Sequence, residues 1–140
     1  MKANEIMTRD PRVVTPETSA QEAASLMESE DTGVLPVVES DQSRRLIGII
    51  TDRDIALRIV GEGRTAARVR DAMTEGARAA RADDDVKSVM EMMAGDKVRR
   101  IPIVDEAGAV IGIISQADIV RDADDDRAER TIERISEPGG

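Results

Sequence analysis

Two short stretches of the chain place a hydroxyl and a carboxylate three residues apart, directly after an apolar run. Thr51 precedes Asp54 in the first stretch, and Ser115 precedes Asp118 in the second. If each pair starts a helix, free backbone N–H groups lie beside the hydroxyl and could hold a phosphate. The carboxylate could then bind the two hydroxyls of a ribose. A variant capping box that only stabilises the helix is the alternative, and one copy alone does not separate the two interpretations.

The elements around these pairs are expected to be a buried strand that runs straight into a helix. The run from Leu46 to Ile50 and the run from Val110 to Ile114 are apolar and rich in β-branched residues, which favours strands. Thr51 and its counterpart are good N-cap residues, so we predict helices that begin at Asp52 and Gln116.

The two stretches belong to an internal repeat that runs through most of the chain. Met7-Thr8 recurs as Met73-Thr74, and Pro36 recurs as Pro102. Each half reads as a short strand, a helix, two strands and a helix. We predict an α/β (α+β) fold in which two β-α-β-β-α repeats pack by pseudo-two-fold symmetry into one module and share a core. The predicted boundaries are residues 3–62 for repeat 1, 63–69 for a linker, 70–123 for repeat 2, and 124–140 for a C-terminal helix extension with a frayed tail.

Several finer features follow from the local pattern. Val13-Val14 is predicted to be the first short strand, and a helix is predicted to begin near Ser19, with Glu22 completing a capping box. The runs 34–38 and 100–104 are predicted to be strands. The proline within each of them indicates a sheet edge or a place where the hydrogen-bond ladder is not needed.

The composition of the 140 residues excludes several classes of function. Twenty Lys and Arg face 29 Asp and Glu, a formal net charge of −9, which argues against nucleic acid or an anionic membrane as a partner. The absence of His and Cys removes the commonest catalytic bases, nucleophiles and metal ligands, so we expect no enzyme. The aspartate runs 83–85 and 124–126 do not converge as metal ligands would, so we expect no metal and no required cofactor. No apolar run is long enough to span a membrane, and we expect a cytoplasmic protein.

The repeat and its motifs resemble a tandem pair of CBS domains, the unit called a Bateman module. The resemblance rests on the two Gly-to-Asp stretches 48–54 and 112–118, the proline-containing strands, and the leading Met7-Thr8 and Met73-Thr74. It covers residues 3 to about 123, and the chain is similar to stand-alone bacterial CBS-pair proteins. The resemblance implies a regulatory module that binds an adenine nucleotide as its ligand.

By this resemblance each binding site combines the motif of one repeat with the leading strand and the proline-containing strand of the other. The residues implied for the first site are Thr51, Asp54, Thr74, Ala79, Val98 and Arg99. The residues implied for the second site are Ser115, Asp118, Thr8, Val13, Thr32 and Gly33.

The two implied sites differ in charge. Arg99 and Arg100 have no basic counterpart in the first repeat, and Arg53 adds a cation to the first motif. Because a guanidinium binds phosphate in a bidentate manner, we expect the Asp54 site to be the more favourable one for anions. Against this, Asp52 adds a carboxylate there. The alternatives are that Arg99 and Arg100 are a solvated pair, and that Arg53 forms an ion pair with a nearby acid.

Two functions remain open at this point. In the first, the chain senses AMP, ADP, ATP, NAD or S-adenosylmethionine and modulates an unidentified partner protein. In the second, it is a ligand-free homodimeric scaffold. The resemblance implies a homodimer in either case, and apolar positions on the second helices could form its face or belong to the core. These positions are Ile55, Ile59, Ile119 and Val120.

Overall fold

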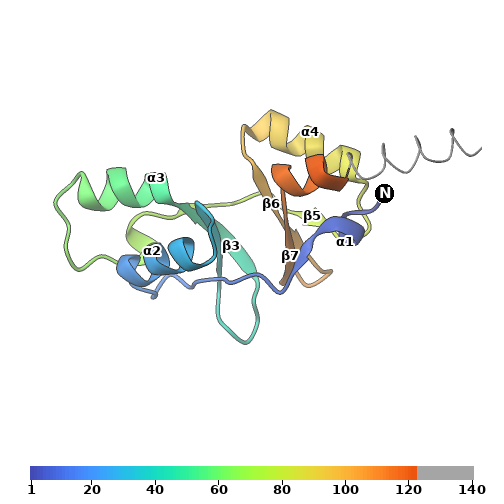
Figure 1. Cartoon of the computed structure of the whole chain (residues 1–140). Coiled ribbons are helices and arrows are strands. Elements are labelled where there is room, and N and C mark those ends of the chain that lie inside the picture. The colour runs from blue at the N-terminus through green and yellow to red at the C-terminus, as the bar shows by residue number, and fades with distance from the viewer. Residues whose placement is uncertain (123–140) are drawn as a thin grey trace, which may run out of the picture.

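The computed structural model describes residues 1–122, which form two similar lobes (Figure 1). The predicted extension and tail, 124–140, lie outside the described residues. The first lobe contains α2 (Ala20–Ser29), β2 (Val34–Val38), β3 (Leu46–Thr51), α3 (Asp52–Ile55), the π-helix η1 (Ala56–Val60), the 3-10 helix η2 (Val69–Asp71) and β4 (Thr74–Glu75). The second contains α1 (Ala3–Ile6), β1 (Thr8–Arg9), β5 (Ala80–Arg81), α4 (Val86–Asp96), β6 (Arg100–Val104), β7 (Val110–Ser115) and a helix over residues 116–122.

The leading strand of each repeat lies in the sheet of the other repeat. One sheet has the order β2-β3-β4 and the other has the order β1-β7-β6-β5. Thr8 of β1 is opposite Ile113 of β7, and Thr74 of β4 is opposite Ile49 of β3. In Figure 1 the blue N-terminal segment leaves α1 beside β7 and crosses to α2 in the other lobe. This exchange joins the two lobes through backbone hydrogen bonds.

Glycine in each motif allows this close approach of the exchanged strand. A Cβ atom on Gly48 would overlap the carbonyl oxygen of Thr74, and one on Gly112 would be 2.5 Å from Sδ of Met7. Real Cβ atoms do not come so near to other heavy atoms. The glycines therefore have a packing role in addition to starting the motifs.

The hydrophobic core is divided in two, so the predicted shared core is wrong. One cluster lies in the first lobe and includes Ala23, Leu35 and Ile50, all nearly inaccessible to solvent. The other lies in the second lobe and includes Val89 and Ile114. Each lobe covers its own sheet with its own helices, and the exchanged segments complete that cover, because Ala3 and Met7 belong to the second cluster.

The local predictions are largely confirmed. The helices after the motifs begin at Asp52 and at residue 116, and Ser19 caps α2 by accepting a hydrogen bond from the Glu22 N–H at 3.0 Å. The predicted strand at Val13-Val14 is wrong. Only Val14 pairs, as a single parallel bridge to Val37, because the segment turns away into the loop before α2.

The two prolines illustrate different placements. Pro36 is in β2, at the end of its sheet order, which confirms the edge interpretation. Pro102 is in β6, between β7 and β5, so the edge interpretation is wrong there. Pairing with β5 begins one residue later, at Ile103 opposite Ala80, so Pro102 occupies a place where no ladder bond is required.

The β2–β3 and β6–β7 hairpins meet at their tips. The N–H of Leu46 donates to the carbonyl of Gly108 at 3.0 Å, and the N–H of Val110 donates to the carbonyl of Arg44 at 2.8 Å. At the same tip the guanidinium of Arg45 donates to Glu39 at 2.7 Å, and this hydrogen bond lowers the pKa of the Glu39 carboxyl below its ordinary value. Among residues 1–122, no helix has both the length and the apolar character needed to cross a bilayer.

Candidate functional site

Both motifs form reciprocal capping contacts at the start of a helix. Oγ1 of Thr51 accepts a hydrogen bond from the Asp54 N–H at 3.0 Å, and Oδ2 of Asp54 accepts one from the Thr51 N–H at 3.0 Å. Ser115 and Asp118 repeat the arrangement at 3.1 and 3.0 Å. The capping interpretation is therefore confirmed. It is compatible with ligand binding, because each carboxylate uses only one oxygen for the cap.

The two motifs differ in what else their side chains contact. Ser115 is 6% exposed, whereas Thr51 is half-buried, so the first hydroxyl is the more accessible one. Oδ1 of Asp118 accepts a hydrogen bond from Nη2 of Arg121 at 2.9 Å. Within residues 1–122, Oδ1 of Asp54 has no hydrogen-bond or ion-pair partner. Within the described residues, Oδ1 of Asp54 is therefore available to a ligand, whereas Oδ1 of Asp118 is already bound by Arg121.

The exchanged leading strands bring two predicted site residues beside the motifs. Thr74 is exposed and lies opposite Ile49, two residues before Thr51 on β3. Thr8 is exposed and lies opposite Ile113, two residues before Ser115 on β7. The strands that carry Thr8 and Thr74 therefore lie beside the motif of the other repeat. A contact between these threonines and a ligand stays a prediction.

The residues before the proline-containing strands contact the motif of their own repeat. The carbonyl of Gly33 accepts from the Asp52 N–H at 2.9 Å, and the carbonyl of Arg99 accepts from the Gln116 N–H at 2.8 Å. Arg100 lies opposite Ser115 in the β6–β7 pair. Among residues 1–122, no hydrogen bond or ion pair joins Arg99 or Arg100 to the first motif, so their predicted part in the Asp54 site is not visible as a contact.

The first motif carries a negative charge on Asp52 next to the positive charge of Arg53. A Cβ atom on Gly33 would be 3.0 Å from Oδ2 of Asp52, so this carboxylate lies over the glycine. Oδ1 of Asp52 accepts from the backbone N–H of Arg53 at 2.8 Å. The exposed Arg53 side chain forms no ion pair within the described part of the chain, contrary to the ion-pair alternative. Its guanidinium is available to a phosphate next to a competing carboxylate.

The remaining predicted residues have less direct connections to the motifs. Thr32 donates its hydroxyl to the carbonyl of Val34 at 3.1 Å, and Val98 packs against the second core cluster. Ala79 is half-buried next to β5, and Val13 is half-buried in the leading segment. None of these contacts assigns a ligand role by itself.

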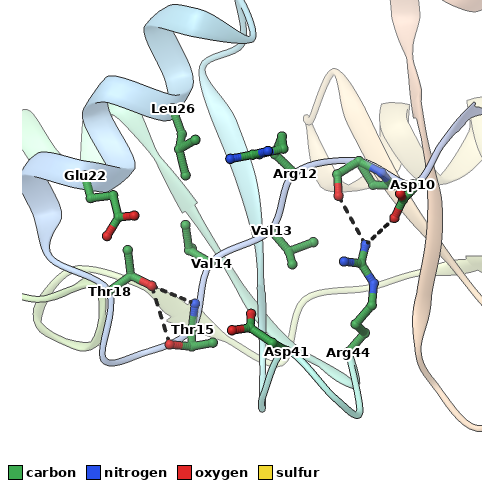
Figure 2. Close-up of a pocket in the computed structure, with 11 residues that line it drawn as sticks. Asp10, Arg12, Val13, Val14, Thr15, Thr18, Glu22, Leu26, Asp41 and Arg44 are labelled. Carbon is green, nitrogen blue, oxygen red and sulfur yellow. Dashed lines mark hydrogen bonds and ion pairs between the residues drawn. The ribbon is translucent and has the colours of Figure 1, made fainter.

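A cavity that the sequence did not indicate lies between the leading segment, α2 and the β2–β3 hairpin (Figure 2). Its volume is about 480 Å³, and of the predicted site residues it includes only Val13. The lining is mainly polar and carries the carboxylates of Asp10, Glu22 and Asp41 with the guanidinium groups of Arg12 and Arg44. The lining residues come from the leading segment, α2 and the hairpin and share no short motif, so no local pattern identifies the cavity. Within the described residues, no group of three or more His, Cys, Asp or Glu side chains could hold a metal ion.

A model of the CBS domain matches residues 3–61 and again residues 69–125. The chain belongs to the CBS domain family. It is a tandem pair, because both copies of the domain are present and each contains one capped Gly-to-Asp motif.

Two curated relatives and one solved structure illustrate the family. The chain is 36% identical over 114 residues to the CBS domain-containing protein YhcV of Bacillus subtilis, covering 81% of this chain and 79% of that protein. It is also 36% identical over 120 residues to an inosine-5'-monophosphate dehydrogenase of Methanocaldococcus jannaschii, but there it covers 86% of this chain and only 23% of the enzyme. The CBS domain pair of protein MJ0100, solved in complex with 5'-methylthioadenosine and S-adenosyl-L-methionine, superposes with a TM-score of 0.77 at 28% identity. That match covers 86% of this chain and 98% of that one.

Proposed function

We propose that this CBS pair is a regulatory module that binds an adenosine-containing ligand in the clefts between its two repeats. The observation that carries the proposal is the placement of an exposed threonine from one repeat beside the capped motif of the other, at both motifs. The MJ0100 domain pair, which shares this fold, was solved with two adenosine compounds. AMP, ADP, ATP, NAD and S-adenosylmethionine all contain the same adenosine unit.

In the first cleft, Asp54 would bind the ribose hydroxyls and Thr51 the phosphate or its equivalent. Oδ1 of Asp54, which has no partner within residues 1–122, supports this assignment, because a carboxylate oxygen can accept a hydroxyl hydrogen bond without loss of the cap. In the second cleft, Asp118 and Ser115 would have the same tasks. Thr74 and Thr8 from the exchanged strands would border the first and the second cleft respectively.

Ligand binding would regulate another protein by changing how the two lobes sit together. The lobes have separate cores and are joined by exchanged strands and hairpin tips, so their relative position depends on few contacts. A ligand can shift such an equilibrium only if it binds the two arrangements with different affinity. The regulated protein is unidentified, and the module itself would act as a homodimer and not as an enzyme.

A ligand-free homodimeric scaffold is the second candidate. It is favoured by the complete capping boxes, which give both motifs a structural purpose without any ligand. The two candidates differ in what the motif carboxylates do beyond the cap.

Calorimetric titration with adenosine, AMP and S-adenosylmethionine separates the candidates. We expect binding to the wild type, and loss of one site each in Asp54→Ala and Asp118→Ala. Asp84→Ala is the matched control, because Asp84 also accepts a hydrogen bond from a backbone N–H three residues earlier, that of Arg81 at 2.8 Å. Removing any of these contacts should lower the free energy of unfolding by about 0.5–2 kcal/mol.

Only the two motif variants should lose binding. At a ligand concentration of about 100 times the Kd of a cleft, the wild type should gain about 2.7 kcal/mol of stability from each filled cleft in thermal unfolding. Absence of heat and of any thermal shift with all three compounds would favour the scaffold instead.

A further inference from the structure

The motif carboxylates are unequal in a way that the repeat alignment explains. Arg121 lies three residues after Asp118, on the same face of the helix, and donates to its Oδ1 at 2.9 Å. Oδ2 of Asp118 is already used by the Ser115 N–H. Both carboxylate oxygens of the second motif therefore have an internal partner, and the Asp118 side chain is only 13% exposed.

The first repeat lacks this arrangement because its residue is apolar. Leu57 is the counterpart of Arg121 when Asp54 is aligned with Asp118. It is 56% exposed and has no group that could donate to Asp54. The difference is thus a single residue, three positions after the carboxylate in each repeat.

We propose that Arg121 lowers the affinity of the second cleft for a ribose by holding Asp118, so that an adenosine ligand fills the Asp54 cleft first. This inference rests on the proposed function, since it assumes that both carboxylates bind ribose hydroxyls. At Oδ1 of Asp118 a ribose hydroxyl must compete with the guanidinium, which already occupies one acceptor position of that oxygen. In the first cleft no such competition arises among the described residues.

The expected loss of ribose affinity at Asp118 follows from the solvent exposure of the Arg121–Asp118 ion pair. Arg121 is 65% exposed, and ion pairs of this kind contribute little in water. Displacing the guanidinium should therefore weaken ribose binding by about two- to fivefold. That is enough to order the filling of two otherwise similar sites, and too small to close the second one.

Single-site variants allow each cleft to be measured alone. In an Asp54→Ala background, which leaves the second cleft, Arg121→Leu should lower the Kd for adenosine about two- to fivefold. In an Asp118→Ala background, which leaves the first cleft, Leu57→Arg should raise it by a similar factor. Leu57→Ala removes the same apolar side chain without adding a hydrogen-bond donor, and it should leave the Kd unchanged. Adenosine is the probe because it has the ribose and no phosphate.

A second probe tests the chemistry of the contact. With 2′-deoxyadenosine, which offers no hydroxyl pair, Arg121→Leu should produce no gain. If Arg121 instead binds a phosphate, the variant will weaken AMP and leave adenosine unchanged, and the proposal is then wrong. Circular dichroism checks that each variant is folded. If the Asp54→Ala background does not fold, the comparison is made on the otherwise wild-type chain with a two-site fit.

The outcomes distinguish this inference from the proposed function. Equal affinity of the two clefts in the wild type, or no response to Arg121→Leu, overturns the role of Arg121 while adenosine binding stands. No binding of adenosine by the wild type or by either single-site variant overturns both.

Discussion

At the scale of single residues, each motif glycine is required for packing, because a side chain there would overlap the leading strand of the other repeat. Gly48 and Gly112 lie directly under the exchanged leading strands, and those strands carry the threonines proposed to border the clefts. A side chain at either position would push the leading strand away. The spacing from glycine to carboxylate therefore couples the packing of the strand to the geometry of the site.

Gly48→Ala and Gly112→Ala should differ in cost. At Gly48 the new methyl group would overlap a backbone atom, the carbonyl oxygen of Thr74, which cannot move without displacing β4. At Gly112 its nearest neighbours are Sδ and Cγ of Met7, at 2.5 and 2.9 Å, and a flexible methionine can rotate away. We expect Gly48→Ala to lower the free energy of unfolding by about 2–3 kcal/mol and Gly112→Ala by about 1 kcal/mol. Urea denaturation measures both, and an equal or reversed order would contradict the assignment of the two contacts.

At the scale of elements, the two repeats place different residues at equivalent positions where the backbone φ angle is positive. Gly76 and Gly108 have positive φ angles of 74° and 83°. Their counterparts in the first repeat are Asp10 and Arg44, at 49° and 52°, in a region that costs a residue with a side chain about 1 kcal/mol or more. The side chain of Arg44 makes contacts that offset this cost, and Figure 2 shows it directed toward Asp10.

Arg44 connects three elements at the hairpin tip. Its guanidinium donates to the carbonyl of Pro11 at 3.1 Å and to the carbonyl of Val110 in the other repeat at 3.3 Å, and it lies 3.5 Å from Oδ1 of Asp10. The Asp10 carboxylate is 91% exposed, so its share of this ion pair is small. The carbonyl contacts are the stronger part, since they involve a charged donor.

Replacing each residue by the glycine of the other repeat should therefore have opposite effects. Asp10→Gly relieves the backbone and loses little, so the free energy of unfolding should stay constant or rise by about 0.5 kcal/mol. Arg44→Gly relieves the same strain but loses the hydrogen bonds to Pro11 and to Val110 of the other repeat, so the free energy of unfolding should fall by about 1–2 kcal/mol. Chemical denaturation of both variants is the measurement. Stabilisation by Arg44→Gly would show that its side chain contributes nothing.

The sequence predicted the features that depend on neighbouring residues. The capping pairs at Thr51 and Ser115 span three residues, so side-chain type and spacing were sufficient. The exchange of leading strands joins residues far apart in the chain, and only the family resemblance indicated it. The separate cores, the polar cavity and the role of Arg121 depend on tertiary packing, and no local pattern showed them. The β-branched pair Val13-Val14 predicts a strand, because the sequence is the same whether one residue pairs or two.

At the scale of the whole molecule, the second helices divide their apolar residues between the core and the surface. Ile59 and Ile119 are 5% and 8% exposed and belong to the two core clusters, so for them the intramolecular interpretation is confirmed. Val120 is 54% exposed and Val60 is 70% exposed. In Figure 1 the helix that contains Val60 and the helix over residues 116–122 lie on the same side of the molecule. The proposed homodimer would bury these exposed valine side chains if its two copies meet on this side.

Val60→Asp should weaken the homodimer by putting a desolvated carboxylate into this face. If one valine side chain is buried per subunit, the two copies of the substitution should cost at least about 3 kcal/mol of association free energy, or a hundredfold in the dimer Kd. Ala107→Asp adds the same charge at the exposed tip of the β6–β7 hairpin and serves as the control. Analytical ultracentrifugation over a range of protein concentrations gives both constants. A monomeric wild type would overturn the homodimer itself, and an equal loss in the two variants would remove the helices from the interface.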